Sequence, residues 1–118
     1  MNENRKFKRK KITINVDCDI SKDQKWLDTS TSDISAGGMC LVTRKALAVG
    51  FQLTMKFLIP DTDRAIIVDG KVIWHEKFLK KNNAENYYNG IQFININRVD
   101  RDFIEKYIES TTFDDKIM

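Results

Sequence analysis

Two arginines near the start of the chain have the chemistry and the spacing to hold a compact anion. Arg5 and Arg9 lie four residues apart in the segment Arg5-Lys-Phe-Lys-Arg9. A guanidinium group presents a planar fork of N–H donors, which pairs bidentately with a phosphate or with the acceptor edge of a guanine base. The two arginines can therefore bracket one ligand. We expect Phe7, between them, to anchor the segment to the rest of the fold.

A second group of polar and small residues follows in Asp33-Ile-Ser-Ala-Gly-Gly38. Asp33 and Ser35 are two residues apart, so they face the same side if the segment is a strand. The carboxylate can accept hydrogen bonds from a guanine or orient an arginine, and the hydroxyl can donate to a phosphate. Gly37 and Gly38 allow a tight turn and a close approach of the backbone to a ligand. A turn closed by side-chain hydrogen bonds is the competing interpretation.

The rest of the composition argues against catalysis and metal binding. The chain has one histidine, His75, and its two cysteines, Cys18 and Cys40, form no Cys-x-x-Cys motif. Four zinc ligands cannot be assembled from this set. The sequence also contains no visible nucleophile–base pair and no phosphate-cradling glycine loop. We therefore expect no enzyme, no metal and no cofactor, and two buried free thiols in a reducing compartment.

The net charge of +3 hides an asymmetry. Residues 1–11 contain six basic residues and one acid, so they carry +5, and the remaining residues carry −2. A basic arm suits an anionic partner such as a phosphate ligand, a nucleic acid or a membrane surface. No apolar run approaches the roughly 20 residues that span a membrane, and nothing after the arm resembles a signal-peptide core. We expect a cytoplasmic protein with a single domain.

Alternating apolar residues predict β-strands over most of the chain. Clear or weaker strand patterns occupy 12–20, 26–32, 39–42, 51–59, 66–74 and 87–96. Polar hairpin residues at 80–86 and a bulge or bend at Gly70 are also expected. Because no crossover helix separates these strands, the pattern predicts a small six-stranded antiparallel barrel.

The hydrophobic period lengthens near the C-terminus and predicts one amphipathic helix of about three turns. Val99, Phe103 and Tyr107 are four residues apart, and we expect them to be buried against one end or edge of the barrel. Asn97 is the expected N-cap. The predicted organisation is a flexible basic arm at 1–11, the barrel with its helix at 12–110, and a frayed tail at 111–118.

Together, the two motifs resemble the PilZ domain, the bacterial receptor module for cyclic di-GMP. The hallmark of that family is RxxxR followed by [D/N]xSxxG, and this chain has both in the same order at a suitable spacing. The similarity covers roughly residues 3–110 and includes Gly70-Lys-Val-Ile-Trp74, Gly90-Ile-Gln-Phe93 and the segment 100–108. It implies a six-stranded barrel with a C-terminal helix, in agreement with the strand pattern.

The resemblance also implies a set of ligand-binding residues. It assigns cyclic di-GMP to Arg5, Arg9, Asp33, Ser35, Gly37 and Gly38. In this assignment the arginines hold guanines and phosphates, and the second motif lines the opposite side of the site.

Further candidates follow from the same resemblance. Trp74 matches a position near the ligand in some relatives, although a core or barrel-end aromatic is the competing interpretation. Lys8 and Lys10 are expected to supply electrostatic attraction. Many relatives carry one more arginine where this chain has Asn4, which leaves open whether one nucleotide or a stacked pair binds.

The implied function is that of a receptor. Binding would change the conformation of the arm and signal to a partner protein that the sequence does not name, and the receptor would be a monomer or a homodimer. Two alternatives stay open. The first is a PilZ-like adaptor that contacts proteins without a nucleotide. The second is a nucleic-acid-binding module, which the basic arm allows but which the missing set of exposed stacking aromatics disfavours.

Overall fold

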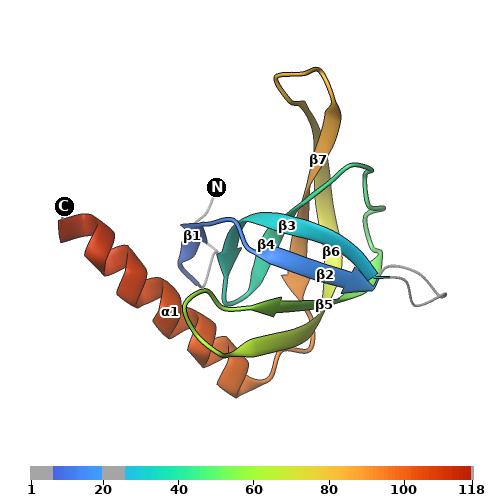
Figure 1. Cartoon of the computed structure of the whole chain (residues 1–118). Coiled ribbons are helices and arrows are strands. Elements are labelled where there is room, and N and C mark those ends of the chain that lie inside the picture. Colours follow the sequence, from blue (N-terminus) through green and yellow to red (C-terminus); the bar gives the residue numbers. More distant parts are fainter. Residues whose placement is uncertain (1–6, 20–25, 118) are drawn as a thin grey trace.

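A closed antiparallel β-barrel makes up most of the computed structural model, which describes residues 7–19 and 26–117, with side chains for 7–19 and 29–111 (Figure 1). Six strands build its wall: β2 (Asn15–Asp19), β3 (Trp26–Ser35), β4 (Gly38–Thr43), β5 (Gln52–Leu58), β6 (Ala65–Leu79) and β7 (Glu85–Phe93). They follow one another in the order β3-β2-β5-β6-β7-β4, and pairing of β4 with β3 closes the ring. The structure confirms the predicted barrel.

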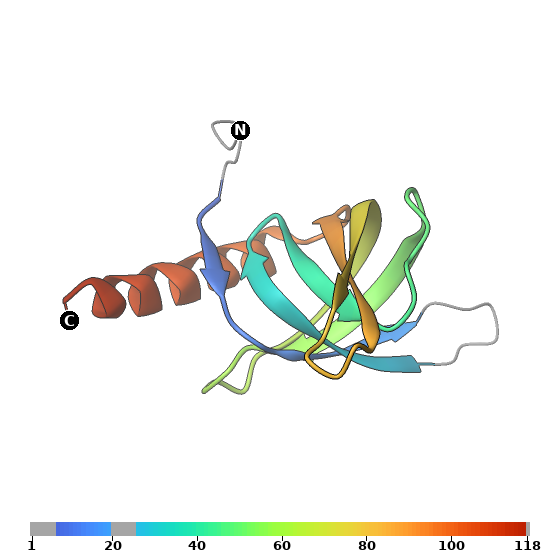
Figure 2. The ribbon, with the colours of Figure 1, turned by 90° about the horizontal axis from the view of Figure 1, so that it is seen from above.

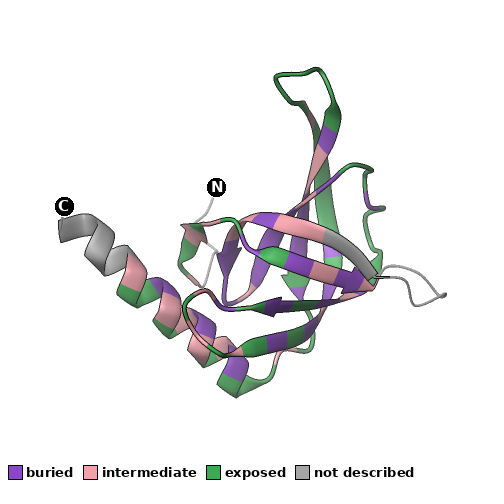
Figure 3. Cartoon of the chain, in the orientation of Figure 1, coloured by how far each residue is buried: buried purple, intermediate pink, exposed green. Residues whose placement is uncertain are grey.

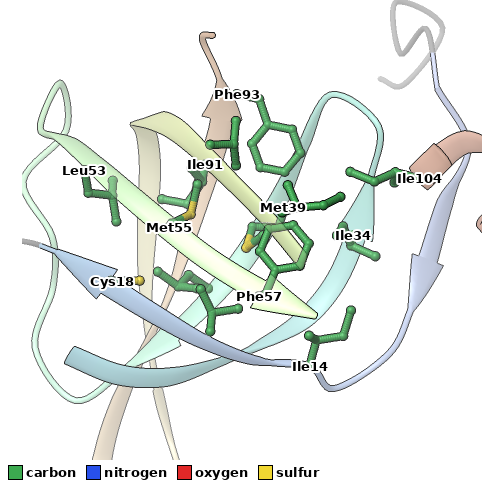
Figure 4. Close-up of a cluster of buried hydrophobic side chains, with 14 of the residues drawn as sticks. Ile14, Cys18, Ile34, Met39, Leu53, Met55, Phe57, Ile91, Phe93 and Ile104 are labelled. Carbon is green, nitrogen blue, oxygen red and sulfur yellow. The ribbon is translucent and has the colours of Figure 1, made fainter. Parts of the chain in front are cut away.

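Alternation of side chains explains why these segments form strands. In β5 every second residue, namely Leu53, Met55 and Phe57, is buried, and the residues between them are exposed or half-buried. Since successive side chains of a strand point to opposite faces, each strand turns one apolar face inward. Figure 4 shows these side chains meeting those of Cys18 and Ile91 in one interior cluster.

Gly70 lies inside a regular part of β6. It has partners in both neighbouring strands, and the irregularity of β6 falls between Val72 and Trp74. The missing side chain has a packing reason, because a Cβ at Gly70 would lie 2.5 Å from Cγ2 of Ile91. The predicted bulge or bend at Gly70 is therefore wrong, and this glycine instead makes room inside the barrel.

One helix, α1 (Arg98–Ile117), lies along the outside of the barrel and contacts β3 (Figure 2). Asn97 caps its first turn as predicted, since its side-chain oxygen accepts a hydrogen bond from the N–H of Asp100 at 2.8 Å. Ile104 and Ile108 are completely buried and join the barrel core. Among the described residues, no helix combines the length and the apolar character needed to cross a membrane.

One expectation about the helix is wrong. Val99 is 64% exposed, because the stripe facing the barrel is centred on Ile104 and Ile108, with Phe103 and Tyr107 half-buried at its edge. The helix extends to residue 117, and the frayed tail expected at 111–118 stays a prediction. The segment 111–117 contains no glycine or proline that would end it.

A short strand, β1 (Arg9–Lys11), precedes the barrel and pairs with residues 33–35 of β3. It uses the same edge of β3 that β2 uses further along. The hydroxyl of Thr31 bridges the interruption, because it donates to the carbonyl of Ile12 at 2.7 Å and accepts from the N–H of Ile14 at 3.0 Å. The chain thus stays attached to β3 from β1 into β2.

The flexible arm expected over residues 1–11 stays a prediction, and its last three residues form β1 in this structure. Backbone groups of β3 would be unpaired at this edge without β1, and pairing them outweighs repulsion among the neighbouring basic side chains. The strand β1 is in contact with α1, and the two elements cross in the view of Figure 2. Residues 1–6, including Arg5, lie outside the described residues.

Beyond the barrel, β6 and β7 continue as a long hairpin (Figure 1). Pairing extends to Leu79 opposite Glu85, so residues 80–84 form the turn, which is shorter than expected. The rings of Phe78 and Tyr88 stack with their centroids 4.1 Å apart. Figure 3 shows that most of this extension is exposed.

Candidate functional site

Two rows of residues cross the outer face of the barrel where β1, β3, β4, β7 and β6 lie side by side. Cross-strand partners share a face, so the pairing register identifies each row. The first row consists of Lys11, Asp33, Cys40, Gly90 and Trp74. The second row consists of Arg9, Ser35, Gly38, Gln92 and Lys71. With adjacent strands roughly 4.8 Å apart, each row extends for roughly 19 Å along the sheet.

An open pocket of about 380 Å³ lies over the first row. Residues from five strands line it, namely Lys11, Ser32, Asp33, Cys40, Trp74 and Tyr88. The pocket combines a cation, a carboxylate and two aromatic rings. These are the groups that recognise a phosphate, the hydrogen-bonding edge of a base and the face of a base.

Arg9 and Asp33 bring the two sequence motifs together. The guanidinium group of Arg9 donates to Oδ1 of Asp33 in an ion pair at the rim of the pocket. Arg9 stands opposite Ser35 in the β1–β3 register, so it reaches Asp33 diagonally on the same face. Both side chains are partly exposed, which leaves the pair accessible to a ligand.

Ser35 has a different place from the one expected of a phosphate donor. It is only 3% exposed, and its hydroxyl accepts from the N–H of Gly37 at 3.1 Å and donates to the carbonyl of Gly38 at 3.3 Å. The turn between β3 and β4 is thus closed by this side chain, as the competing interpretation of the motif proposes. In this structure Ser35 shapes the site from beneath.

Each of the two glycines in the motif avoids a different steric clash. A Cβ at Gly38 would lie 2.1 Å from the carbonyl oxygen of Ile91, so only glycine lets β4 approach β7 this closely. A Cβ at Gly37 would lie 3.1 Å from the ring of Phe7. Phe7 is half-buried against the core, which confirms that it anchors the N-terminal segment.

Trp74 is a wall of the pocket and not a core residue, so the core interpretation is wrong. Pairing of Val72 with Ile91 and of Trp74 with Gly90 leaves one extra residue in β6, and this bulge reverses the alternation. Val72 points into the barrel, whereas Trp74 lies on the outer face and is 44% exposed. The ring covers Gly90, where a Cβ would lie 2.1 Å from Nε1 of Trp74.

The lysine that lines the pocket is Lys11, which is not among the ligand-binding residues predicted from the sequence. Lys10 lies on the opposite face of β1, where its charge opposes the rise that burial causes in the pKa of Tyr107 on α1. Burial and neighbouring acids raise the pKa of Glu105 on α1, and Lys8 opposes that rise. Lys8 and Lys10 therefore act electrostatically on the helix. Lys11 could have been predicted from the sequence, because it lies two residues after Arg9 and so shares its face of a strand.

Both cysteines are buried free thiols, as predicted. Burial raises the pKa of the Cys18 thiol to about 12, and it also raises the pKa of Cys40. Cys40 forms part of the pocket lining, but a protonated thiol there acts as a small apolar surface. Within residues 7–19 and 26–117 no cluster of histidine, cysteine and acidic side chains has the makings of a metal site.

Comparison with known proteins agrees with this geometry. The family model described as "PilZ domain" matches residues 3–110. The chain belongs to the PilZ domain family. No curated protein matches the chain in sequence.

Solved PilZ structures share the fold at low sequence identity. The PilZ domain of YcgR from Escherichia coli with c-di-GMP is 17% identical, with a TM-score of 0.70 and coverage of 97% of this chain and 95% of that one. The MrkH–c-di-GMP complex of K. pneumonia is 20% identical, with a TM-score of 0.78 and coverage of 97% and 55%. The inhibitor of motility MotI/DgrA of Bacillus subtilis is 17% identical, with a TM-score of 0.78 and coverage of 95% and 53%. The chain thus spans about half the length of MrkH and MotI.

Sequence reasoning missed several pocket residues of this PilZ domain. Cys40 and Tyr88 enter the pocket only because β4 and β7 pair next to β3 and β6. Ser32 enters because the register of β3 shifts between Thr31 and Asp33. These contacts depend on cross-strand register, which a single strand pattern does not contain.

Proposed function

We propose that this PilZ domain is a receptor for cyclic di-GMP. The observation that carries the proposal is the meeting of Arg9 and Asp33 at the rim of a pocket walled by Trp74 and Tyr88. The complexes of YcgR and MrkH with c-di-GMP support the choice of ligand, because they share the fold. Ser35, Gly37 and Gly38 serve this site by shaping the turn that presents Asp33.

In this proposal, different groups of the site bind different parts of the ligand. Arg9 and Lys11 are the cations for the two phosphate charges, and Arg5 joins them from the N-terminal side. Trp74 and Tyr88 offer faces on which a guanine stacks. Asp33 accepts from a guanine edge or keeps Arg9 in position.

The proposed response is a change in the N-terminal segment. Arg9 exchanges its bond to Asp33 for a bond to phosphate, and the segment that carries Arg5 closes over the ligand. Ordering a residue costs about 1–2 kcal/mol. Charge-assisted hydrogen bonds contribute about 1.5–3 kcal/mol each, so several must form together. The new surface then signals to a partner protein in the cytoplasm, and the domain acts by binding, without catalysis or a cofactor.

Isothermal titration calorimetry of the full chain with cyclic di-GMP tests this function, with cyclic di-AMP and GTP as controls at physiological salt. The expected result is saturable binding that prefers the guanine dinucleotide. Its stoichiometry distinguishes one nucleotide from a stacked pair. The absence of both heat and thermal stabilisation would contradict the proposal and favour a nucleotide-independent adaptor. Binding of all three nucleotides with equal affinity and steep salt dependence would favour general polyanion binding.

A further inference from the structure

An acidic side chain beside the pocket has no partner in the described structure. Glu76 follows Trp74 by two residues on β6 and stands directly opposite Tyr88 of β7. It is exposed, and it forms no hydrogen bond or ion pair with any described residue. An uncompensated carboxylate next to a site for a dianion is unfavourable unless the ligand itself offers donors to it.

The aromatic contacts of the hairpin establish which face Glu76 occupies. Phe78 stacks on Tyr88, and His75 meets Tyr87 edge to face, so even-numbered residues of this part of β6 share a face with Tyr88 and odd-numbered residues do not. Because Trp74 and Tyr88 both line the pocket, Glu76 lies on the pocket face between two of its walls.

We propose that Glu76 reads the edge of a guanine base that stacks against Tyr88 and thereby sets the preference for guanine over adenine. This inference rests on the proposed cyclic di-GMP site. The carboxylate accepts from the ring N–H and the amino group of guanine. Adenine has no ring N–H on that edge and presents an amino donor where guanine has the carbonyl.

Glu76→Gln tests the proposal with little change in shape. One acceptor oxygen becomes a donor that faces the donors of guanine. We expect the affinity for cyclic di-GMP to fall about tenfold to a hundredfold, as for loss of a bidentate base contact, and the affinity for cyclic di-AMP to stay the same. Titration calorimetry with both nucleotides measures this ratio.

Glu85→Gln is the matched control. Glu85 lies on the same hairpin but on its opposite face, where it pairs with Lys77 at 3.8 Å. This variant should change neither affinity.

The outcomes separate this inference from the function on which it rests. Wild-type protein that binds neither nucleotide overturns both. Wild-type binding of cyclic di-GMP with an equal or higher affinity in Glu76→Gln overturns only the role of Glu76, since an unpaired carboxylate would then merely repel the ligand. An equal loss for both nucleotides also overturns it, because the residue would not select between bases.

Discussion

At the scale of single residues, the site is built from side chains that compete for the same partners. Asp33 holds Arg9 in the unliganded protein, so a phosphate must offer the guanidinium group at least as good a partner. Lys11 lies on the same strand as Arg9, and Trp74 lies further along the same face on β6. The ion pair thus keeps the guanidinium group of Arg9 at the rim of the pocket.

Arg9→Ala should remove most of the binding of cyclic di-GMP and leave the fold intact. The side chain lies at the rim of the pocket, and the pairing of β1 with β3 uses its backbone. Loss of a charge-assisted contact costs about 1.5–3 kcal/mol, which corresponds to about tenfold or more in affinity. Titration calorimetry measures the affinity, and thermal unfolding checks the fold.

The matched control for this variant is Arg98→Ala on α1, whose side chain is largely exposed and does not line the pocket. It should leave the affinity unchanged. Wild-type affinity in Arg9→Ala would show that the ligand does not use the rim of this pocket.

At the scale of elements, the β3–β4 turn and the bulge in β6 position the site. The turn is closed by the hydroxyl of Ser35, and the bulge turns Trp74 from the inner to the outer face. Each decides which side chains reach the pocket face of a barrel whose interior is otherwise regular.

Gly38→Ala and Gly37→Ala should separate folding from binding. The new methyl at Gly38 meets backbone, which cannot move cheaply, so we expect a loss of unfolding free energy of about 1–3 kcal/mol. At Gly37 it meets the ring of Phe7, which can shift, so stability should change little while the N-terminal segment is displaced and nucleotide affinity falls.

Urea unfolding and titration calorimetry of both variants measure these effects. A Gly37→Ala protein that is less stable than Gly38→Ala would show that the packing of Phe7 matters more than the approach of β4 to β7.

At the scale of the whole molecule, the barrel core couples stability to pH through Cys18. Burial raises the pKa of this thiol to about 12, well above the value of an unfolded chain. The unfolded state therefore loses its proton first as the pH rises, and binds fewer protons than the folded state. Stability then falls with increasing pH between about 9 and 12, and the contribution is fully present below that window.

Cys18→Ala should flatten this dependence. In the wild type this thiol lowers the unfolding free energy by up to about 1.4 kcal/mol for each pH unit above its unfolded pKa. The variant lacks that contribution, so the difference in stability between the two proteins should shrink from pH 8 to pH 10.5. Urea titrations at both pH values measure it, and a constant difference would mean that the thiol ionises in the folded barrel at its ordinary pKa.

Local sequence patterns were enough to predict the strands, the start of the helix and the two motifs. Period-two alternation, an N-cap and the spacing of Arg, Asp and Gly residues are all properties of a short segment. Alternation of Leu53, Met55 and Phe57 could be read without knowledge of any neighbour. The glycines of the second motif could also be recognised in the sequence, but the steric clashes that they avoid could not.

Which residues lie next to one another depends on how distant strands pair in the folded protein. Lys11 rather than Lys10 lines the pocket because β1 pairs with β3 in one register, and Val99 is exposed because the barrel contacts a neighbouring stripe of α1. Trp74 leaves the core because one extra residue in β6 inverts the faces beyond it. Register and bulges arise from pairing between distant strands, so no local pattern in this chain encodes them.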